Sequence, residues 1–374
     1  MIPRILTQTL IDKLNDNKLV VLRGPRKSGR LTLLQTITDL SAAGVLVLDG
    51  EKKKVRKGFD NLESFRELSH GKSLIVIREA QLFTSLQAII DECLESKSIF
   101  NVILLCSFEP SLQEDLWEAL RYQGLELTLY PLTYTETAQS LGLAQEEKLI
   151  EQRLIYGYYP EIVMHPDEVE QRLYDILESS VFTQLGATER INKKEKLIKL
   201  LRLLAFHIGK VISYNELGKQ CDLDNETVER YVSLFEKADL LFQLTSFNNG
   251  HRYELKKSHV VYFVDNGIRN ALIRAFQPFE YRNDIPELWR NWVISERRKA
   301  NKYANRTPDT YFWLTHTKQE VDYIEITGET AIGYKMQWDK KRAIKIPSSF
   351  QEAYPAIKVT GVNRSTFWTF IQKK

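Results

Sequence analysis

The chain has little of what marks several classes of protein. Its 374 residues include three cysteines, which stand far apart and offer neither a disulfide framework nor the spacing of metal ligands. No apolar run approaches the roughly eighteen residues that span a bilayer, and the first residues lack the apolar core of a signal peptide. We therefore expect a cytoplasmic protein without a membrane partner.

Charge of one sign is also scarce. The net charge is +3, with 27% charged and 43% hydrophobic residues, which is ordinary for a folded globular protein. So small an excess of positive charge does not by itself indicate a nucleic-acid partner. The length predicts two to three domains, each able to bury its own core.

A glycine-bearing loop is the most informative feature that is present. Gly24 and Gly29 have the spacing of the phosphate-loop pattern G-x-x-x-x-G-K-[ST]. Residues 18–22 before the loop read as a buried strand, and residues 31–37 after it read as a helix. Strand, loop and helix in this order let backbone N–H groups hold an anion at the start of the helix. The candidate nucleotide-binding residues are Gly24, Pro25, Arg26, Lys27, Ser28, Gly29, Arg30, Leu31 and Thr32.

Two side chains of this pattern contact the phosphates and the metal ion, and both are replaced here. Arg30 stands where the lysine reaches the terminal phosphates, and Leu31 stands where a hydroxyl holds Mg²⁺. Leucine cannot ligate a metal ion. Arginine can pair with phosphate, but it is longer and planar and does not reproduce a point charge.

A second strand, residues 73–77, should end near the loop. An ATPase of this class needs a carboxylate there to hold Mg²⁺, followed by a glutamate that orients water. Arg78 occupies the first position with the wrong charge, and Glu79 occupies the second. Glu79 is therefore the one candidate catalytic residue, as a remnant, and Mg²⁺ is not expected to bind.

Three interpretations of the loop remain open. It binds ATP with little or no hydrolysis, which we favour, or it is an active ATPase in which Arg30 or Lys27 replaces the lysine. In the third interpretation the loop is a strand-to-helix turn that binds nothing. Loss of phosphate and metal stabilisation costs several kcal/mol of barrier, on the order of 10³-fold in rate.

Alternation of apolar runs and amphipathic stretches sets the fold class of the first part. It predicts an α/β fold with a parallel sheet, helices on its faces and ligands at the carboxyl ends of its strands. The expected strands are residues 19–22, 45–48, 74–77, 102–105 and 125–129.

The remaining sequence reads as three further parts. Residues 134–206 have a helical pattern. Helices at 194–206, 214–221 and 224–231 precede a hairpin of 240–244 with 252–255 around residues 248–250, which is the arrangement of a winged helix. A mixed α/β part follows. The expected domains are 1–137 (P-loop core), 138–192 (helical lid), 193–256 (winged helix) and 257–374 (C-terminal α/β domain).

Taken together, these motifs resemble the bacterial and archaeal AAA+ proteins that join an ATPase domain to a C-terminal domain of unknown function. The resemblance covers nearly the whole chain. It rests on the loop, on the strand followed by residues 78–81, on Cys106 and Ser107, on residues 131–136 (PLT-x-x-E) and on residues 157–161 (G-x-x-P-E). It implies ATP as the ligand and association with nucleic acid or with a catalytically intact partner, and an oligomer is compatible with it.

The same resemblance implies a restriction-endonuclease-like core for the C-terminal domain. Such sites gather two carboxylates and a lysine around a divalent metal. Here Asp322 and Lys335 are present, but Gly333 replaces one acid and Arg290 another. Glu296, Asp322 and Lys335 are the candidates for a vestigial site. The alternatives are charged side chains on a folded scaffold, which we favour, and a metal-dependent nuclease.

Two further interpretations carry no nucleotide chemistry. A winged helix can read DNA through the helix at 225–235, but Glu226 and Glu229 on its exposed side oppose phosphate contact. The basic segments 52–57 and 340–342 are candidate nucleic-acid paths or solvated loops. The rivals to a nucleotide-binding regulatory or assembly component are thus an active ATPase, a DNA-binding regulator and a scaffold.

Overall fold

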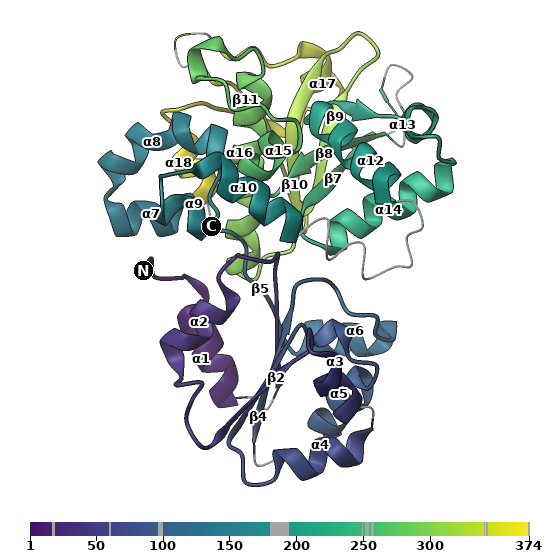
Figure 1. Cartoon of the computed structure of the whole chain (residues 1–374). Coiled ribbons are helices and arrows are strands. Elements are labelled where there is room, and N and C mark those ends of the chain that lie inside the picture. Colours follow the sequence, from purple (N-terminus) through teal and green to yellow (C-terminus); the bar gives the residue numbers. More distant parts are fainter. Residues whose placement is uncertain are drawn as a thin grey trace. The chain divides into compact units, whose positions relative to one another are not determined.

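The structure, a computed structural model, describes residues 1–16, 19–59, 61–95, 100–179, 194–248, 250, 254–255, 258–339, 341 and 343–372. The chain divides into two compact units (Figure 1). One unit contains residues 1–132 and 237–239, and the other contains residues 133–236 and 240–374.

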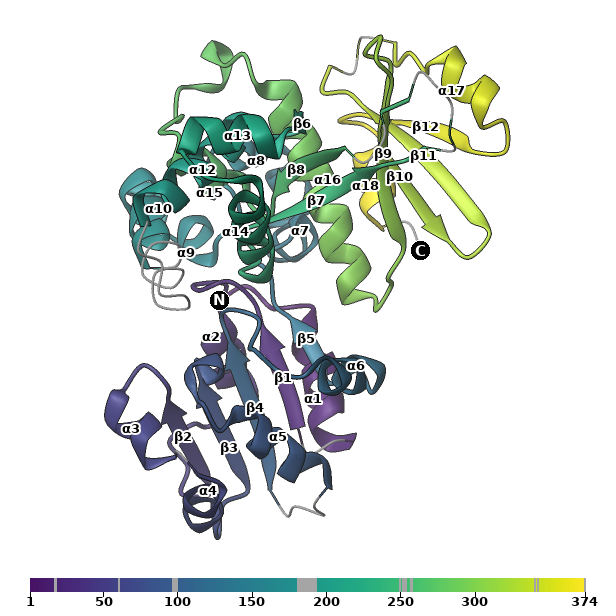
Figure 2. The same ribbon diagram turned by 90° about the vertical axis from the view of Figure 1, so that its right-hand side faces the viewer.

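The described part of the first unit contains a five-stranded parallel sheet with strand order β2-β3-β4-β1-β5 (Figure 2). Non-consecutive neighbours require crossovers, which helices provide. The strands are β1 (Leu19–Arg23), β2 (Val45–Asp49), β3 (Leu74–Arg78), β4 (Asn101–Cys106) and β5 (Glu126–Thr128). All five strands lie where the sequence predicts them, and the α/β fold class is confirmed.

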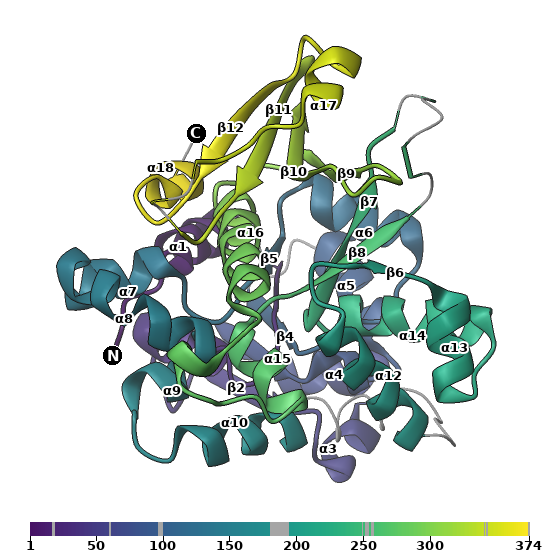
Figure 3. The same cartoon turned by 90° about the horizontal axis from the view of Figure 1, so that it is seen from above.

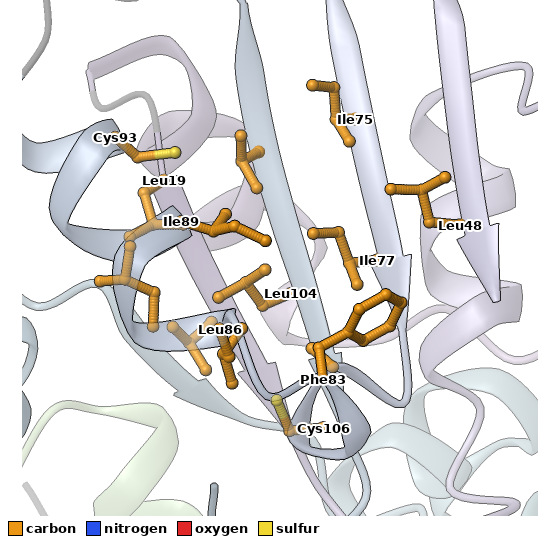
Figure 4. Close-up of a cluster of buried hydrophobic side chains, with 14 of the residues drawn as sticks. Leu19, Leu48, Ile75, Ile77, Phe83, Leu86, Ile89, Cys93, Leu104 and Cys106 are labelled. Atoms are coloured by element: carbon orange, nitrogen blue, oxygen red, sulfur yellow. The ribbon is translucent and has the colours of Figure 1, made fainter. Parts of the chain in front are cut away.

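Helices cover both faces of this sheet, so its strands read as continuous apolar runs. Figure 4 shows strand residues such as Ile75, Ile77 and Leu104 packed against Leu86 and Ile89 of one helix, all of them buried. The helices of the unit are α1 (Leu6–Asp16), α2 (Arg30–Ile37), α3 (Lys53–Gly58), α4 (Leu62–Ser69), the 3₁₀ turn η1 (Ala80–Leu82), α5 (Leu86–Glu95) and α6 (Glu114–Tyr122).

The second unit begins with helices, as the sequence predicts for residues 134–206 where they are described. Residues 180–193 of that prediction lie outside the described residues. The helices are α7 (Tyr134–Leu141), α8 (Leu143–Tyr156), α9 (Pro160–Met164), α10 (Val169–Leu177), α12 (Lys194–Phe206), α13 (Tyr214–Cys221) and α14 (Asn225–Lys237).

A mixed sheet follows in the second unit, with seven strands among the described residues in the order β12-β11-β10-β9-β7-β8-β6. The strands are β6 (Val211–Ile212), β7 (Leu241–Ser246), β8 (His259–Phe263), β9 (Asp309–Leu314), β10 (Glu320–Thr327), β11 (Thr330–Met336) and β12 (Lys358–Val362). The remaining helices are α15 (Asn266–Leu272), the 3₁₀ turn η3 (Phe279–Tyr281), α16 (Ile285–Tyr303), α17 (Ser348–Ala353) and α18 (Phe367–Gln372).

One predicted strand pairing is wrong. The sequence suggests that β7 turns back onto residues 252–255, but its antiparallel partner is β8, with Leu241 opposite Phe263. Of the predicted partner strand, residues 252–253 lie outside the described residues, and Glu254 bridges to Thr315 instead. The reason is burial: residues 260–263 form a continuous buried run, which gives a central strand more apolar area than 252–255 offers.

The helix α16 is the longest in the described part of this unit (Figure 3). It contacts β8, α8, α15 and α18. Polar side chains along it are buried, among them Asn291, Glu296 and Arg297, and each makes hydrogen bonds to the surrounding elements. The helix therefore contributes both packing contacts and buried polar side chains to the unit.

Among the described residues, none of the helices has the length and apolar character that crossing a membrane requires.

Candidate functional site

The glycine loop lies between β1 and α2, at the carboxyl edge of the parallel sheet. Gly24 has φ +143, and a Cβ there would come within 2.1 Å of the Leu129 carbonyl oxygen. Gly29, with φ +98, immediately precedes α2. A side chain at position 24 would clash, and both positions need a conformation that glycine adopts readily. The strand–loop–helix geometry predicted from the spacing is therefore present.

The loop and the first turn of α2 present several hydrogen-bond donors. The first N–H groups of a helix have no partner within the helix, and Gly29 has no side chain to cap them. The Ser28 hydroxyl is buried and makes no hydrogen bond, and the same holds for Nη1 of Arg30. Lys27 also has a positive φ, +64, whereas Thr32 is exposed on α2. Unsatisfied buried donors of this kind fit an anion such as a phosphate group.

Glu79 follows β3 and lies beside the loop. Arg30 Nη2 is 3.2 Å from its Oε1, and Arg26 Nη2 is 3.4 Å from its Oε2. Its Oε2 also accepts hydrogen bonds from the Gln81 amide, at 2.9 Å, and from the Ser107 hydroxyl. Three of these four side chains contact Oε2, and Arg30 contacts Oε1, so both oxygens of Glu79 have partners.

The charges of this cluster shift the pKa values of its members. Burial alone would raise the pKa of the Glu79 carboxyl, but Arg30, Ser107 and Arg26 together bring it below its ordinary value. Burial lowers the pKa of Arg30, and the charge of Glu79 opposes that shift. Glu79 is therefore ionised at neutral pH. Because a guanidinium stays protonated in proteins, Glu79 and Arg30 form an ion pair that is mostly shielded from water.

The residues present do not fit a magnesium ion. The Leu31 side chain has no ligand atom, and Arg78 points its guanidinium at Asp49, with 3.3 Å between Nη1 and Oδ2. Nowhere in the described ranges do three His, Cys, Asp or Glu side chains converge as a metal site would require. The sequence did not single out Asp49, which becomes relevant only because β2 and β3 pair with Asp49 opposite Arg78.

We predict that Glu79→Gln destabilises the first unit by about 3 kcal/mol at pH 7, because it leaves Arg30 buried beside a neutral partner. The folded pKa of Glu79 lies below its ordinary value of 4.5, so its stabilising contribution is complete above that pH. It is lost as the pH falls through the lower folded pKa.

Urea unfolding of both proteins between pH 7 and pH 3.5 measures this effect. The difference between wild type and variant should shrink below about pH 4.5. Glu118→Gln on α6, an exposed position, is the matched control and should change stability by less than about 0.5 kcal/mol. An equal loss in both variants would contradict the prediction.

A second charge cluster joins α16 to β10 and β11. Arg290 Nε is 3.1 Å from Asp322 Oδ1, and its Nη2 is 3.1 Å from Glu320 Oε1. Lys335 Nζ is 2.8 Å from Glu320 and 3.3 Å from Asp322. Two carboxylates thus face two cations, so the guanidinium of Arg290 lies against the acids that a nuclease would use to bind a metal ion.

Glu296, the third predicted member of that site, has different partners. Its carboxylate accepts hydrogen bonds from Lys299 Nζ at 2.8 Å and from the backbone N–H of Tyr134 at 2.7 Å. Burial raises its pKa, and the charge of Lys299 opposes the shift. The structure brings Asp322 and Lys335 together and places Glu296 in a separate cluster, because Glu296 lies on another face of α16 than Arg290.

Two signature motifs have structural roles in the second unit. Thr133 and Glu136 form a reciprocal capping box at the start of α7. Gly157 has φ +74, and a Cβ there would come within 2.1 Å of Asp265 Oδ1. The other carboxylate oxygen of Asp265, Oδ2, accepts a hydrogen bond from the Tyr158 N–H. Pro160 is at the first turn of α9, where proline costs no hydrogen bond. These motifs hold the second unit together.

Comparisons with known proteins agree with this architecture. Residues 16–138 match the AAA domain family, residues 147–278 match a domain of unknown function (DUF8612), and residues 287–367 match another domain of unknown function (DUF4143). The parallel sheet and its glycine loop define the class, a P-loop NTPase fold. The chain thus joins a segment that matches the AAA domain family to a C-terminal segment that matches a domain of unknown function.

Relatives occur in bacteria and archaea. An uncharacterized protein of Haemophilus influenzae is 22% identical over 289 residues, which cover 71% of this chain and 72% of the relative. An uncharacterized protein of Methanocaldococcus jannaschii is 24% identical over 302 residues, which cover 69% of this chain and 63% of the relative. A solved Walker-type ATPase of Pyrococcus abyssi is 15% identical, with TM-score 0.49, over 73% of this chain and 96% of that one.

Proposed function

We propose that this protein binds ATP through the loop of residues 24–31 without rapid hydrolysis, and that it acts as a regulatory or assembly component. The loop keeps the backbone cradle, the helix start and a buried cation. It lacks the metal hydroxyl and the metal carboxylate. Binding and chemistry are thus separated, since the cradle uses backbone groups whereas hydrolysis needs side chains that are absent.

The ion pair between Arg30 and Glu79 is the observation that carries this proposal. Arg30 keeps positive charge at the loop, with Nη1 still available as a donor. In the same geometry Glu79 is engaged by Arg30, Arg26, Gln81 and Ser107. A general base must accept a proton from the attacking water, and these donors hold the pKa of the Glu79 carboxyl below its ordinary value, which makes it a weaker base for that water.

Calorimetry with ATP, with and without Mg²⁺, tests the proposal beside an assay of phosphate release. We expect affinities that agree within about threefold in the two conditions, because Leu31 and Arg78 supply no metal ligand. Turnover should be on the order of 10³-fold slower than is typical of ATPases with intact motifs. Fast magnesium-dependent turnover would support the active-ATPase alternative, and absence of ATP binding would support the scaffold.

We also propose a winged helix made of α12, α13, α14 and the β7–β8 pair, which extends the expected 193–256 module to Phe263. The exposed side of α14 includes Glu226, Glu229 and Arg230, and two acids among three charges disfavour contact with phosphates. The module is therefore better suited to a protein partner than to DNA.

The division into a P-loop core (1–137), a lid (138–192) and the following domains is part of this proposal.

For residues 257–374 we propose a restriction-endonuclease-like core without nuclease chemistry. The cluster of Glu320, Asp322 and Lys335 has the residue types of such a site, but Arg290 supplies the positive charge that a metal ion would bring. Two cations already balance two acids, so a divalent ion would have to displace a buried guanidinium. The domain then serves as a folded platform for a nucleic-acid or protein partner.

A further inference from the structure

A cavity of about 190 Å³ lies in the second unit and is lined by residues of α16, β7, β9 and β10 and of the loop between α16 and β9. No sequence motif pointed to it, and it involves neither the glycine loop nor the Asp322 cluster. It is lined by Phe242, Leu244, Ile294, Arg298, Asn301, Lys302, Arg306, Thr307, Pro308, Thr310 and Tyr323.

The sheet topology explains why a space is left here. The strands β7 and β9 are parallel neighbours, but their recorded pairs are Thr245 with Tyr311 and Ser246 with Phe312. Phe242 and Leu244 precede the paired stretch and line the cavity. The floor is consequently apolar, and α16 closes it from one side with Ile294.

The polar wall of the cavity is strongly cationic. Arg298 and Lys302 are four residues apart on α16, so they share one face, and Arg306 follows in the next loop. No carboxylate is among the described residues that line the cavity. Glu325 of β10, which does not line the cavity, accepts hydrogen bonds from Arg297 and from Asn301.

The cations around this wall act on one another. Burial lowers the pKa of Arg306, the charge of Arg297 lowers it further, and Glu325 opposes both effects. Bringing an anion into the cavity would offset this repulsion. Burial also raises the pKa of Tyr323, so its phenol is protonated at neutral pH and can donate a hydrogen bond.

The orientation of Arg298 adds a recognition element. Its guanidinium carbon lies 4.7 Å from the ring centroid of Phe242, a cation–π distance. A guanidinium placed on a ring offers its N–H fork edge-on, which is the geometry that suits phosphate oxygens. The exposed Lys302 and Thr307 lie at the rim, which gives a ligand access from solvent.

We propose that this cavity binds a small phosphomonoester, with the phosphate against Arg298, Lys302 and Arg306 and the ester group on the apolar floor. At about 30 Å³ per water, the volume corresponds to roughly six waters, which suits a phosphate with a compact organic group. A nucleic-acid strand would instead need an open basic groove. The site is independent of nucleotide binding by the glycine loop.

Calorimetry of the full chain with phenyl phosphate and with ribose 5-phosphate tests the proposal. We expect one site per chain and an affinity that falls at least about tenfold in Arg306→Gln and in Lys302→Gln, because each substitution removes a charge-assisted hydrogen bond. ATP affinity should be unchanged in both variants. Arg202→Gln, at an exposed position of α12, is the matched control and should bind both probes like the wild type.

The glycine loop also attracts phosphate, so Arg30→Ala separates the two sites. Retention of phenyl phosphate binding in Arg30→Ala together with its loss in Arg306→Gln supports the cavity. The reverse pattern would overturn it, as would undetectable binding of both probes. Binding restricted to 5′-phosphorylated single-stranded DNA would also overturn it, because that result would make the ligand a nucleic-acid end.

Discussion

Replacing Arg30 with alanine should weaken ATP binding by about 100-fold. The substitution removes the buried cation of the loop, and a hydrogen bond to a charged group is worth about 1.5–3 kcal/mol. It also leaves the Glu79 carboxylate without its partner at 3.2 Å. A carboxylate that has lost this cation repels phosphate more strongly, so the two effects act in the same direction.

A double variant separates these two contributions. Arg30→Ala with Glu79→Gln also removes the negative charge of Glu79, and it should recover roughly tenfold of the lost affinity while leaving the cation absent. Lys57→Ala, an exposed lysine of α3, is the matched control for lost charge and should bind ATP normally. Calorimetry without Mg²⁺ measures all four proteins, and unchanged binding in Arg30→Ala would refute the role of this arginine.

The parallel sheet was predictable because each of its strands is an apolar run bounded by polar or glycine residues. The glycine loop was predictable for a related reason, since Gly24 and Gly29 meet backbone requirements that a sequence pattern records directly. The partner of β7 was not predictable. Two segments follow the turn that the sequence predicts at residues 248–250, and the choice between them depends on burial in the complete sheet.

The charge pairs could not be predicted from the sequence. Arg30 and Glu79 are 49 residues apart, and they meet because β3 and β1 both pair with β4. Arg290 reads in the sequence as a missing acid, and only the fold shows it as the counter-ion of Asp322. Glu296 seemed to belong to the same site because a linear motif does not record which face of a helix each side chain occupies.

Restoring the lost side chains should give the protein a requirement for magnesium. The variant Arg30→Lys, Leu31→Thr, Arg78→Asp brings back the lysine, the hydroxyl and the carboxylate of the phosphate-loop pattern. The carboxylate introduced at position 78 would face Asp49 across the β2–β3 pair, where Arg78 now lies 3.3 Å from Asp49. Two carboxylates placed so closely favour a divalent cation between them.

We expect Mg²⁺ to tighten ATP binding to this triple variant at least tenfold, and phosphate release to rise on the order of 10²-fold or more over the wild type. Phosphate release can increase because Arg30→Lys also removes the guanidinium that now pairs with Glu79. The matched control carries Leu31→Val in place of Leu31→Thr and should gain neither property, since valine has the shape of threonine without the ligand oxygen. Equal magnesium dependence in both variants would show that the metal is held elsewhere, and the assignment of position 31 as the lost metal ligand would then be wrong.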